Sequence, residues 1–177
     1  FGGRAVGIHG KSVFIGSRNP PVKGEDGTPV DLGFVGTVHG FQPEDVLAAI
    51  AAETVPVISP VASEEGTGAA LNVNADIAAA SLAGRLKAAK FVYISDVLGV
   101  MRDPADASSL IPSLDRAGVE KLVNERVITG GMIPKVRAAL SALGAGVLKV
   151  RWIDGRIPHS LLLEIFTESG IGTEIVP

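Results

Sequence analysis

The stretch Phe91-Val92-Tyr93-Ile94-Ser95-Asp96 is the best starting point for the fold, because a run of apolar residues ends abruptly in two polar ones. A short apolar run of this kind is typical of a buried strand in an α/β sheet. An Ala-rich segment from Asn74 to about Lys87 comes before it and has the composition of a helix. Outward from this pair, predicted helices and buried strands alternate. The alternation predicts an α/β fold, a three-layer αβα sandwich with a mainly parallel open sheet.

The remaining elements are predicted from local patterns. Polar segments rich in Pro and Gly are expected to form an exposed hairpin or loop over 18–31 and a loop over 60–68. Strands are predicted over 5–8, 13–15, 32–38, 55–59, 147–153 and 173–176, and helices over 43–53, 115–124, 134–143 and 160–166.

The composition excludes several classes of function. A formal charge of −3 argues against general nucleic-acid binding, which needs a basic surface. The chain has no cysteine, and its three histidines lie far apart, so no metal site is expected. No apolar run is long enough to span a membrane, and a cytoplasmic location is the default expectation, with an organelle as the alternative.

Gly10-Lys11-Ser12 resembles the end of a phosphate-binding P-loop, but the pattern is incomplete. A P-loop needs a glycine five residues before Gly10, and Ala5 stands there. The segment also lies between two predicted strands and does not open a helix. We therefore do not expect a P-loop here.

Gly130-Gly131-Met132-Ile133-Pro134-Lys135 places a lysine in the first turn of a predicted helix. A cation at this end opposes the helix dipole, whereas a bound anion would gain from the dipole, the free N–H groups and the ammonium together. The segment therefore favours a phosphate-binding lysine. The alternative is a solvated lysine after a flexible turn.

Two further segments allow a structural and a functional interpretation. In Asn72-Val73-Asn74-Ala75-Asp76, Asn74 suits a helix N-cap and Asp76 suits the first turn, but helix capping does not explain Asn72. Ser95-Asp96-Val97-Leu98-Gly99-Val100 is either an ordinary turn after a strand or part of a nucleotide site at the carboxyl end of a sheet.

The motifs together are similar to the amino-acid kinase family, and within it to the kinases of N-acetyl-L-glutamate. The likeness runs nearly end to end. It rests on the segments already quoted and on Ala5-Val6-Gly7-Ile8-His9-Gly10-Lys11, Val30-Asp31-Leu32-Gly33-Phe34-Val35-Gly36, Ile153-Asp154-Gly155-Arg156 and Gly170-Ile171-Gly172-Thr173.

The resemblance implies transfer of the γ-phosphoryl group of ATP, with Mg²⁺ bridging the nucleotide phosphates, to the side-chain carboxylate of N-acetyl-L-glutamate, an early step of arginine biosynthesis. It implies that Lys135 stabilises the transferring group, that Asp76 organises the catalytic lysines, and that Asn72 and Asn74 bind the acyl substrate. It implies two lobes. Residues 1–90 are the remainder of an N-terminal lobe that binds the acyl substrate, and residues 91–177 form the nucleotide-binding lobe. Along the nucleotide it places Asp96, Val97, Leu98, Gly99, Val100, Met101, Val127, Ile128 and Thr129.

The end of the chain resembles the arginine-sensitive branch of the family. The segment Glu164-Ile165-Phe166-Thr167-Glu168-Ser169-Gly170 implies a feedback site for L-arginine at Glu164 and Gly170, and an amphipathic helix closed by a glycine is the alternative. The branch also implies a homo-oligomer, a dimer or a hexamer. A PII-type partner is known for the family in some lineages.

The chain begins at Phe1 within a Gly-rich loop, so upstream sequence is expected to be missing. The family's phosphate loop, its first catalytic lysine and its substrate-gripping arginine have no counterpart here. Lys11-Ser12-Val13 also departs from the more usual Lys-Asp-Gly. We therefore expect negligible catalysis from this chain alone. The alternatives are another amino-acid kinase, such as the carrier-protein aminoadipate kinase, and a non-catalytic nucleotide-binding module.

Overall fold

The computed structural model describes residues 2–167 and 170–177, and the chain forms two compact units, 1–79 and 80–177. The division falls within helix α2 (Ala75–Arg85), before the predicted boundary at 90/91. The later part of α2 belongs to unit 2 because Ala80 and Ala83 are buried in the hydrophobic core of that unit.

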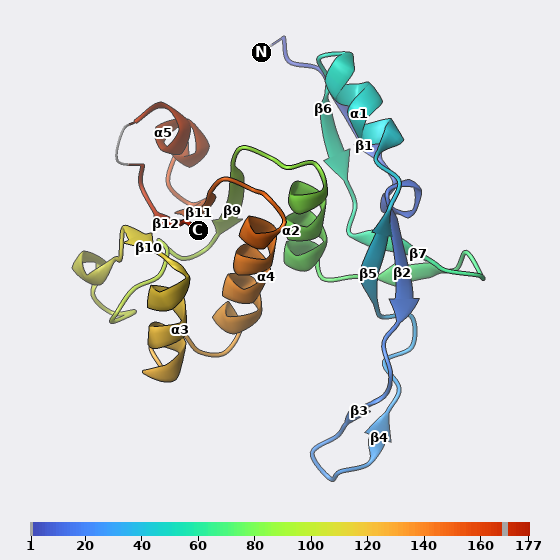
Figure 1. The fold of residues 1–177 in the computed structure, drawn as a ribbon, viewed down its shortest axis with the longest axis horizontal. Coiled ribbons are helices and arrows are strands. Elements are labelled where there is room, and N and C mark those ends of the chain that lie inside the picture. Colours follow the sequence, from blue (N-terminus) through green and yellow to red (C-terminus); the bar gives the residue numbers. More distant parts are fainter. Residues whose placement is uncertain (1, 168–169) are drawn as a thin grey trace. The chain divides into compact units, whose positions relative to one another are not determined.

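In unit 1, strands β1 (Ala5–Ile8) and β6 (Val55–Ile58) pair in parallel, and helix α1 (Glu44–Ala51) packs on both (Figure 1). The connection from β1 is a single 3-10 turn, η1 (Gly10–Ser12). Gly10 packs against the main-chain oxygens of Ser59 and Val61, where a Cβ would collide. Since η1 lies between two strands, Gly10-Lys11-Ser12 forms no P-loop, as the sequence predicted.

A second sheet of unit 1 has the order β5-β2-β7-β8 and both parallel and antiparallel pairs. A small hairpin of β3 and β4 extends the loop between β2 and β5, where the sequence predicted an exposed hairpin or loop. The bounds are β2 (Phe14–Arg18), β3 (Val22–Lys23), β4 (Pro29–Val30), β5 (Gly36–Phe41), β7 (Val61–Glu64) and β8 (Ala70–Asn72).

Two local predictions for unit 1 are wrong in detail. Segment 60–68 is not a loop throughout, because β7 lies within it and pairs with β2 and β8. The predicted strand 32–38 begins later, at Gly36, because the Asp31 carboxylate accepts a hydrogen bond from the Gly33 N–H (2.8 Å) and closes a turn. Both corrections depend on contacts that local apolar patterning does not reveal.

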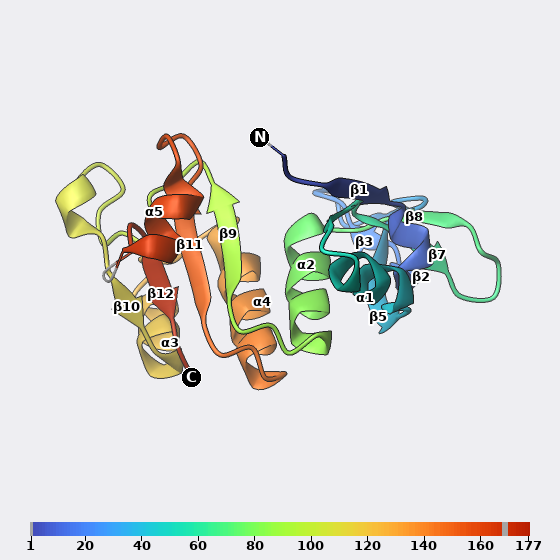
Figure 2. The same cartoon turned by 90° about the horizontal axis from the view of Figure 1, so that it is seen from above.

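Unit 2 contains one sheet with helices on both faces (Figures 1 and 2). Its order is β10-β12-β11-β9; β9–β11 and β10–β12 are parallel, and β11–β12 is antiparallel. Helix α5 packs on β11 from one face, and α3 and α4 cover the other. The bounds are β9 (Phe91–Ser95), η2 (Ala107–Ser109), β10 (Ser113–Leu114), α3 (Arg116–Asn124), α4 (Met132–Gly144), β11 (Val150–Asp154), α5 (Ser160–Phe166) and β12 (Thr173–Ile175).

The core of unit 2 lies between its sheet and helices α3 and α4. Trp152 of β11 is fully buried, and its ring stacks on Tyr93 of β9 with centroids 4.7 Å apart. Val136 and Ala139 of α4 lie in the same cluster. At the start of α3, the Asp115 carboxylate accepts a hydrogen bond from the Gly118 N–H (2.7 Å), as expected of an N-cap.

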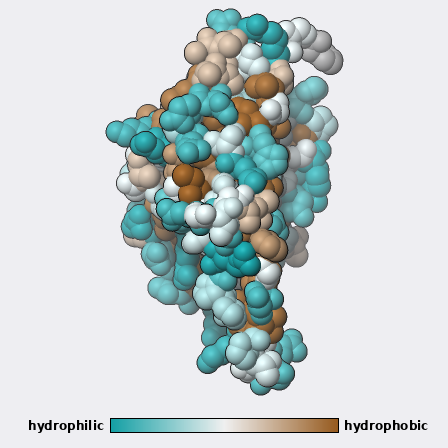
Figure 3. All heavy atoms as spheres, turned by 90° about the vertical axis from the view of Figure 1, so that its right-hand side faces the viewer, coloured by the Kyte–Doolittle hydropathy of each residue, from teal (hydrophilic) through white to brown (hydrophobic). Residues whose placement is uncertain are grey.

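The structure confirms the predicted α/β class, with sheets that are mixed. The sequence placed helix 160–166 and strand 5–8 at the bounds that the structure gives. Figure 3 looks onto unit 1 and shows hydrophobic areas between hydrophilic ones, and exposed apolar residues of this unit include Leu47, Val55 and Val57. Among the helices of the described residues, none combines the length and the apolar character that a membrane span requires.

Candidate functional site

An open cavity of about 200 Å³ in unit 2 brings together two segments that the sequence had singled out separately. One is the end of β9 and the turn after it, and the other is the beginning of α4. The cavity is lined by Ser95, Asp96, Val97, Gly131, Met132, Lys135 and Trp152.

Helix α4 begins at this cavity with features that suit an anion. Gly130 has a φ of +52° and turns the chain into the helix, and Gly131 is an N-cap without a side-chain hydrogen bond. Pro134 in the first turn has no N–H to leave unsatisfied. Lys135 follows and is half-buried at the cavity. The helix dipole and an ammonium group therefore act on the same space.

The opposite side of the cavity lies at the carboxyl end of parallel strands. Ser95 of β9 and Asp154 of β11 are register partners at this edge, where open α/β sheets bind their ligands. Asp154 is buried and accepts hydrogen bonds from the Arg156 guanidinium at 2.7 to 3.1 Å. Arg156 lowers the pKa of Asp154, and Asp154 raises the pKa of Arg156, to which the Asp96 carboxylate adds a smaller contribution.

The Asp154–Arg156 pair was not predicted as part of a site. Its only signal was the segment Ile153-Asp154-Gly155-Arg156 in the family resemblance. The pairing fixes the loop after β11 beside the loop after β9, since the Gly155 N–H also donates to the Ser95 main-chain oxygen (2.8 Å).

Of the residues expected along a nucleotide, Asp96 and Val97 line the cavity, whereas Val100 and Ile128 have fully buried side chains in the core of unit 2. Val100 also uses both main-chain polar groups within the chain: its N–H donates to the Thr173 hydroxyl (2.8 Å), and its oxygen accepts from the Ile111 N–H (2.9 Å). Their side chains support the loops from the core, and a position of these two residues along the nucleotide stays a prediction. The other residues predicted along the nucleotide also lie outside the lining of this cavity: Leu98, Gly99, Met101, Val127 and Thr129.

In unit 1 the structure separates the roles of the polar residues before α2. Asn74 caps the helix, because its side-chain oxygen accepts a hydrogen bond from the Ile77 N–H (3.0 Å). Asn72 and Asn74 are exposed while Leu71 and Val73 are buried, as expected if the two asparagines lie on the same side of an extended segment. Asp76 lies in the first turn of α2 and is half-buried.

Asn74 also lines a cavity of about 120 Å³ in unit 1. Thr37 and Asn19 lie at this cavity, and the Thr37 hydroxyl donates a hydrogen bond to the Asn19 side-chain oxygen (2.7 Å). The cavity therefore offers amide and hydroxyl groups beside an otherwise apolar wall, a combination that suits a small polar ligand.

Replacing Asn74 by alanine is expected to lower the free energy of unfolding by about 1 kcal/mol, the usual cost of an N-cap. Asn74→Ser, which keeps a capping oxygen, should recover most of this loss. Asn72→Ala should leave stability nearly unchanged, since its side chain is exposed and makes no hydrogen bond within the described residues. Urea denaturation measures all three, and equal losses for Asn72→Ala and Asn74→Ala would contradict the assignment of the cap.

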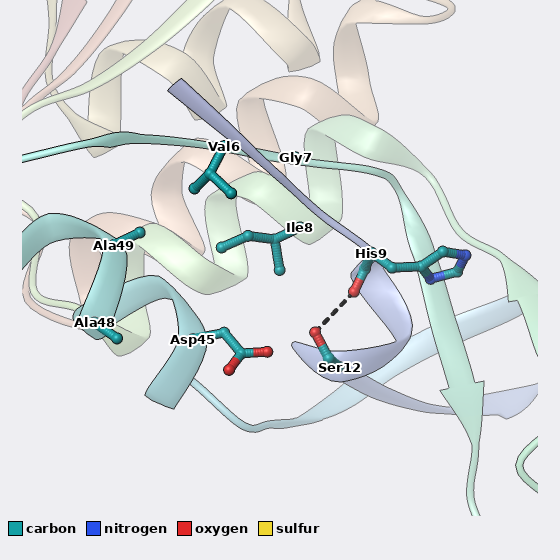
Figure 4. A pocket seen from close by; sticks show the side chains of 8 residues that line it. All are labelled: Val6, Gly7, Ile8, His9, Ser12, Asp45, Ala48 and Ala49. Atoms are coloured by element: carbon teal, nitrogen blue, oxygen red, sulfur yellow. Dashed lines mark hydrogen bonds between the residues drawn. The ribbon is translucent and has the colours of Figure 1, made fainter. Parts of the chain in front are cut away.

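A second cavity of unit 1, about 400 Å³, lies between β1 and α1 and holds none of the predicted site residues (Figure 4). Its wall is mainly apolar, with Val6 and Ile8 from β1 and Ala48 and Ala49 from α1. The Asp45 carboxylate points toward Ser12, whose hydroxyl donates to the main-chain oxygen of His9 (3.0 Å). Its only signal in the sequence was the segment Ala5-Val6-Gly7-Ile8-His9-Gly10-Lys11 of the family resemblance, and the rest of its lining comes from Ser12 and from α1.

The two residues expected at a regulatory arginine site lie together in unit 2. A Cβ on Gly170, whose φ is +65°, would approach the Glu164 carboxylate to 2.5 Å. Glu164 is fully buried, and its carboxylate pairs with Arg151 (Nε–Oε1 2.9 Å). Arg151 also reaches Glu174 (3.2 Å), which Lys149 contacts at 2.9 Å. Residues 168 and 169 of the same predicted segment lie outside the described residues.

This ion network predicts a pH dependence of stability. The hydrogen bond from Lys149, reinforced by the charges of Arg151, Lys149 and Lys90, lowers the pKa of Glu174 from its usual 4.5. Glu174 therefore contributes stability above that value, and the contribution is lost as the pH falls through the lower pKa of the folded state. Urea midpoints measured between about pH 6 and pH 3 should fall more steeply for the unsubstituted chain than for Glu174→Gln. Parallel slopes below pH 4.5 would show that Glu174 is not the titrating group.

Comparison with known proteins gives one consistent family. The sequence model of the amino acid kinase family matches residues 2–154. Acetylglutamate kinase of Akkermansia muciniphila is 52% identical over 176 residues, which are 99% of this chain and 59% of that protein. Acetylglutamate kinase of Archaeoglobus fulgidus is 42% identical over 99% of this chain and 62% of that protein. The chain thus spans about three fifths of the length of these relatives.

Solved structures agree with the family at the level of the fold. N-acetylglutamate synthase from Neisseria gonorrhoeae, complexed with coenzyme A and L-arginine, superimposes with a TM-score of 0.79 at 26% identity, over 98% of this chain and 38% of that chain. An isopentenyl phosphate kinase in a substrate complex gives a TM-score of 0.62 at 21% identity, over 98% and 60%. The family model matches most of the length of this chain, and the structure shows α/β units. This chain therefore belongs to the amino acid kinase family.

Proposed function

We propose that unit 2 binds the phosphates of ATP in the cavity at the start of α4, and that the complete gene product transfers the γ-phosphoryl group to the side-chain carboxylate of N-acetyl-L-glutamate. The cavity carries the proposal, because it joins Lys135 and the start of a helix to the carboxyl end of β9. The identity to proteins named acetylglutamate kinase supports the choice of acceptor.

The chemistry of this transfer matches the residues present. A carboxylate is already ionised near neutral pH, so the reaction needs no general base. The obstacle is electrostatic, because one anion must approach a polyphosphate. Lys135 would stabilise the charge on the transferring group, and Asp76 would orient the lysines that do so. Asn72 and Asn74 would hold the acyl substrate, with Thr37 and Asn19 beside Asn74.

Magnesium fits this arrangement as a companion of the nucleotide. Mg²⁺ is commonly held by one or two carboxylates together with substrate phosphates, not by an all-protein cage. Asp96 is the carboxylate in the cavity lining, and the described part of the chain contains no group of three or more histidine or acidic residues that could hold a metal. When bound, Mg²⁺ would neutralise charge on the phosphates.

Feedback control by L-arginine and a homo-oligomeric state, a dimer or a hexamer, belong to the same proposal, as does a cytoplasmic location. Glu164 and Gly170 remain the proposed arginine site. Since Arg151 of the chain already pairs with Glu164, the guanidinium of an effector would have to share or displace that contact. L-arginine is therefore expected to inhibit the complete gene product only if this ion pair opens.

The test is hydroxylamine trapping of the acyl phosphate formed by the complete gene product with MgATP. Hydroxamate should form with N-acetyl-L-glutamate and not with a carrier-protein-linked aminoadipate. Hydroxamate with the aminoadipate acceptor alone would transfer the assignment to that kinase. No hydroxamate with either acceptor, from folded protein that binds ATP, would favour a nucleotide-binding module without this activity.

A further inference from the structure

Asn19, the residue after β2, is fixed by two hydrogen bonds at the cavity of about 120 Å³ in unit 1. Its main-chain N–H donates to the Val35 main-chain oxygen (2.9 Å), and its side-chain oxygen accepts from the Thr37 hydroxyl (2.7 Å). All three residues line the cavity. Because the side-chain oxygen is engaged, the amide NH₂ group is the part of Asn19 that remains for another partner.

The amide nitrogen of Asn19 is accessible. It makes no hydrogen bond within the described residues, yet it does not belong to the buried side-chain atoms that lack a partner, so a ligand can reach it. Asn74, on the α2 side of the cavity, is held in the same way, since its side-chain oxygen accepts from the Ile77 N–H (3.0 Å). The cavity therefore brings together two asparagines that each keep their amide donors for a ligand.

The rest of the lining indicates which group of a ligand fits. None of the described residues that line this cavity is charged, and the wall is mostly apolar, with Val35, Val73 and Ile77. A carboxylate placed here would lose solvation with no cation to offset the cost. A neutral amide with a methyl group suits both parts of the lining, because its carbonyl oxygen accepts from amide donors and its methyl group packs on the apolar wall.

The size of the cavity agrees with one small group of a substrate. At about 120 Å³ it is smaller than the roughly 300–1,000 Å³ that hold a whole drug-sized ligand. N-acetyl-L-glutamate, the proposed acceptor, has two carboxylates and one neutral acetamido group. The acetamido group is the one that matches an uncharged cavity with amide donors.

We infer that Asn19 is a specificity-determining residue, whose side-chain NH₂ group donates a hydrogen bond to the carbonyl oxygen of the substrate's acetyl group. Thr37 is a positioning residue, since its hydroxyl holds the Asn19 amide in this orientation. This inference rests on the proposed function and adds two residues to its substrate site. The acetyl group is remote from the carboxylate that is phosphorylated, so the contact should be equal in the ground and transition states and act on KM.

Steady-state kinetics of the complete gene product, followed by hydroxamate formation, test this role. Asn19→Ala should raise KM for N-acetyl-L-glutamate about three- to tenfold, the usual effect of one neutral hydrogen bond, and leave kcat and the KM for MgATP unchanged. Thr37→Val, which removes the hydroxyl and keeps the side-chain shape, should raise the same KM less. The double variant should be no weaker than Asn19→Ala alone, because Thr37 acts through Asn19. Asn124→Ala, at an exposed asparagine of α3, is the control and should change none of these values.

The outcomes separate this inference from the proposed function. If the unsubstituted enzyme forms no hydroxamate with N-acetyl-L-glutamate, both fail. If it is active and Asn19→Ala has an unchanged KM for this acceptor, the role of Asn19 is overturned and the proposed function stands. Equal changes in kcat and in the KM for MgATP also overturn it, because they indicate a general change in structure. Additive losses in the double variant overturn the positioning role of Thr37. Should Asn19→Ala not fold, Thr37→Val is the second variant, and an unchanged KM there overturns the inference.

Discussion

Replacing Lys135 by alanine in the complete gene product is expected to lower kcat for hydroxamate formation by about 10²–10³, the usual effect of removing one electrostatic stabiliser of a transition state. Lys135 lies in the first turn of α4, where the ammonium and the helix dipole act on the same cavity. Water cannot replace an ammonium that is held in position before the reaction begins. The loss should therefore appear mainly in kcat, since the charge on the transferring group is greatest in the transition state.

Lys121→Ala is the matched control for this prediction. Lys121 is also a helical lysine, but it lies on α3 with a side chain that is 70% exposed and pairs with Glu125 at 3.8 Å. Its removal should leave kcat unchanged. A kcat for Lys135→Ala within about threefold of the unsubstituted enzyme would contradict the role of Lys135, and a rise in KM alone would indicate that it binds substrate and transition state equally.

Replacing Arg151 by alanine is expected to lower the free energy of unfolding by about 3–5 kcal/mol, the cost of leaving a buried charge without its partner. Arg151 is nearly buried, and its guanidinium contacts Glu164 and Glu174. Without Arg151, the Glu164 carboxylate keeps the Ile171 N–H at 3.2 Å and Lys90 only at 4.0 Å. These contacts do not compensate for a fully buried negative charge.

The double variant Arg151→Met with Glu164→Gln tests the cause of this loss. Because it removes both charges and keeps side-chain volume, it should be more stable than Arg151→Ala alone. Guanidinium chloride would screen the charges, so urea is the denaturant to use. Lys121→Ala again is the control, with an expected change within about 0.5 kcal/mol. A loss under 1 kcal/mol for Arg151→Ala would show that Glu164 is not buried as a charged group.

The sequence predicted the alternation of helices and strands well, because apolar periodicity and capping residues act locally. Asn74 is the N-cap that the sequence predicted, and Asp115, where the next helix was predicted to begin, is the N-cap of α3. Helix α5 has the predicted bounds. Strand β7 was missed because it has few apolar residues and depends on pairing with β2 and β8, which are distant in sequence.

The candidate site was predicted only in part, for a similar reason. Gly130-Gly131 with Lys135, and Ser95 with Asp96, carry signals of turns and helix starts, and the structure brings these segments to one cavity. The burial of Val100 and Ile128 could not be read from motifs, since it depends on packing under α3 and α4. Trp152 of the cavity lining was missed because an indole in an apolar strand is ordinarily a core residue.

Amide NMR of the ¹⁵N-labelled chain, titrated with MgATP, would show whether the phosphates of ATP bind at the start of α4. If the phosphates bind there, the largest shifts should occur at Gly131, Met132 and Lys135 and at Asp96 and Val97. Adenosine should not reproduce the shifts at Gly131 and Lys135. Shifts confined to other parts of the chain, such as the cavity between β1 and α1, or none at millimolar MgATP, would contradict it.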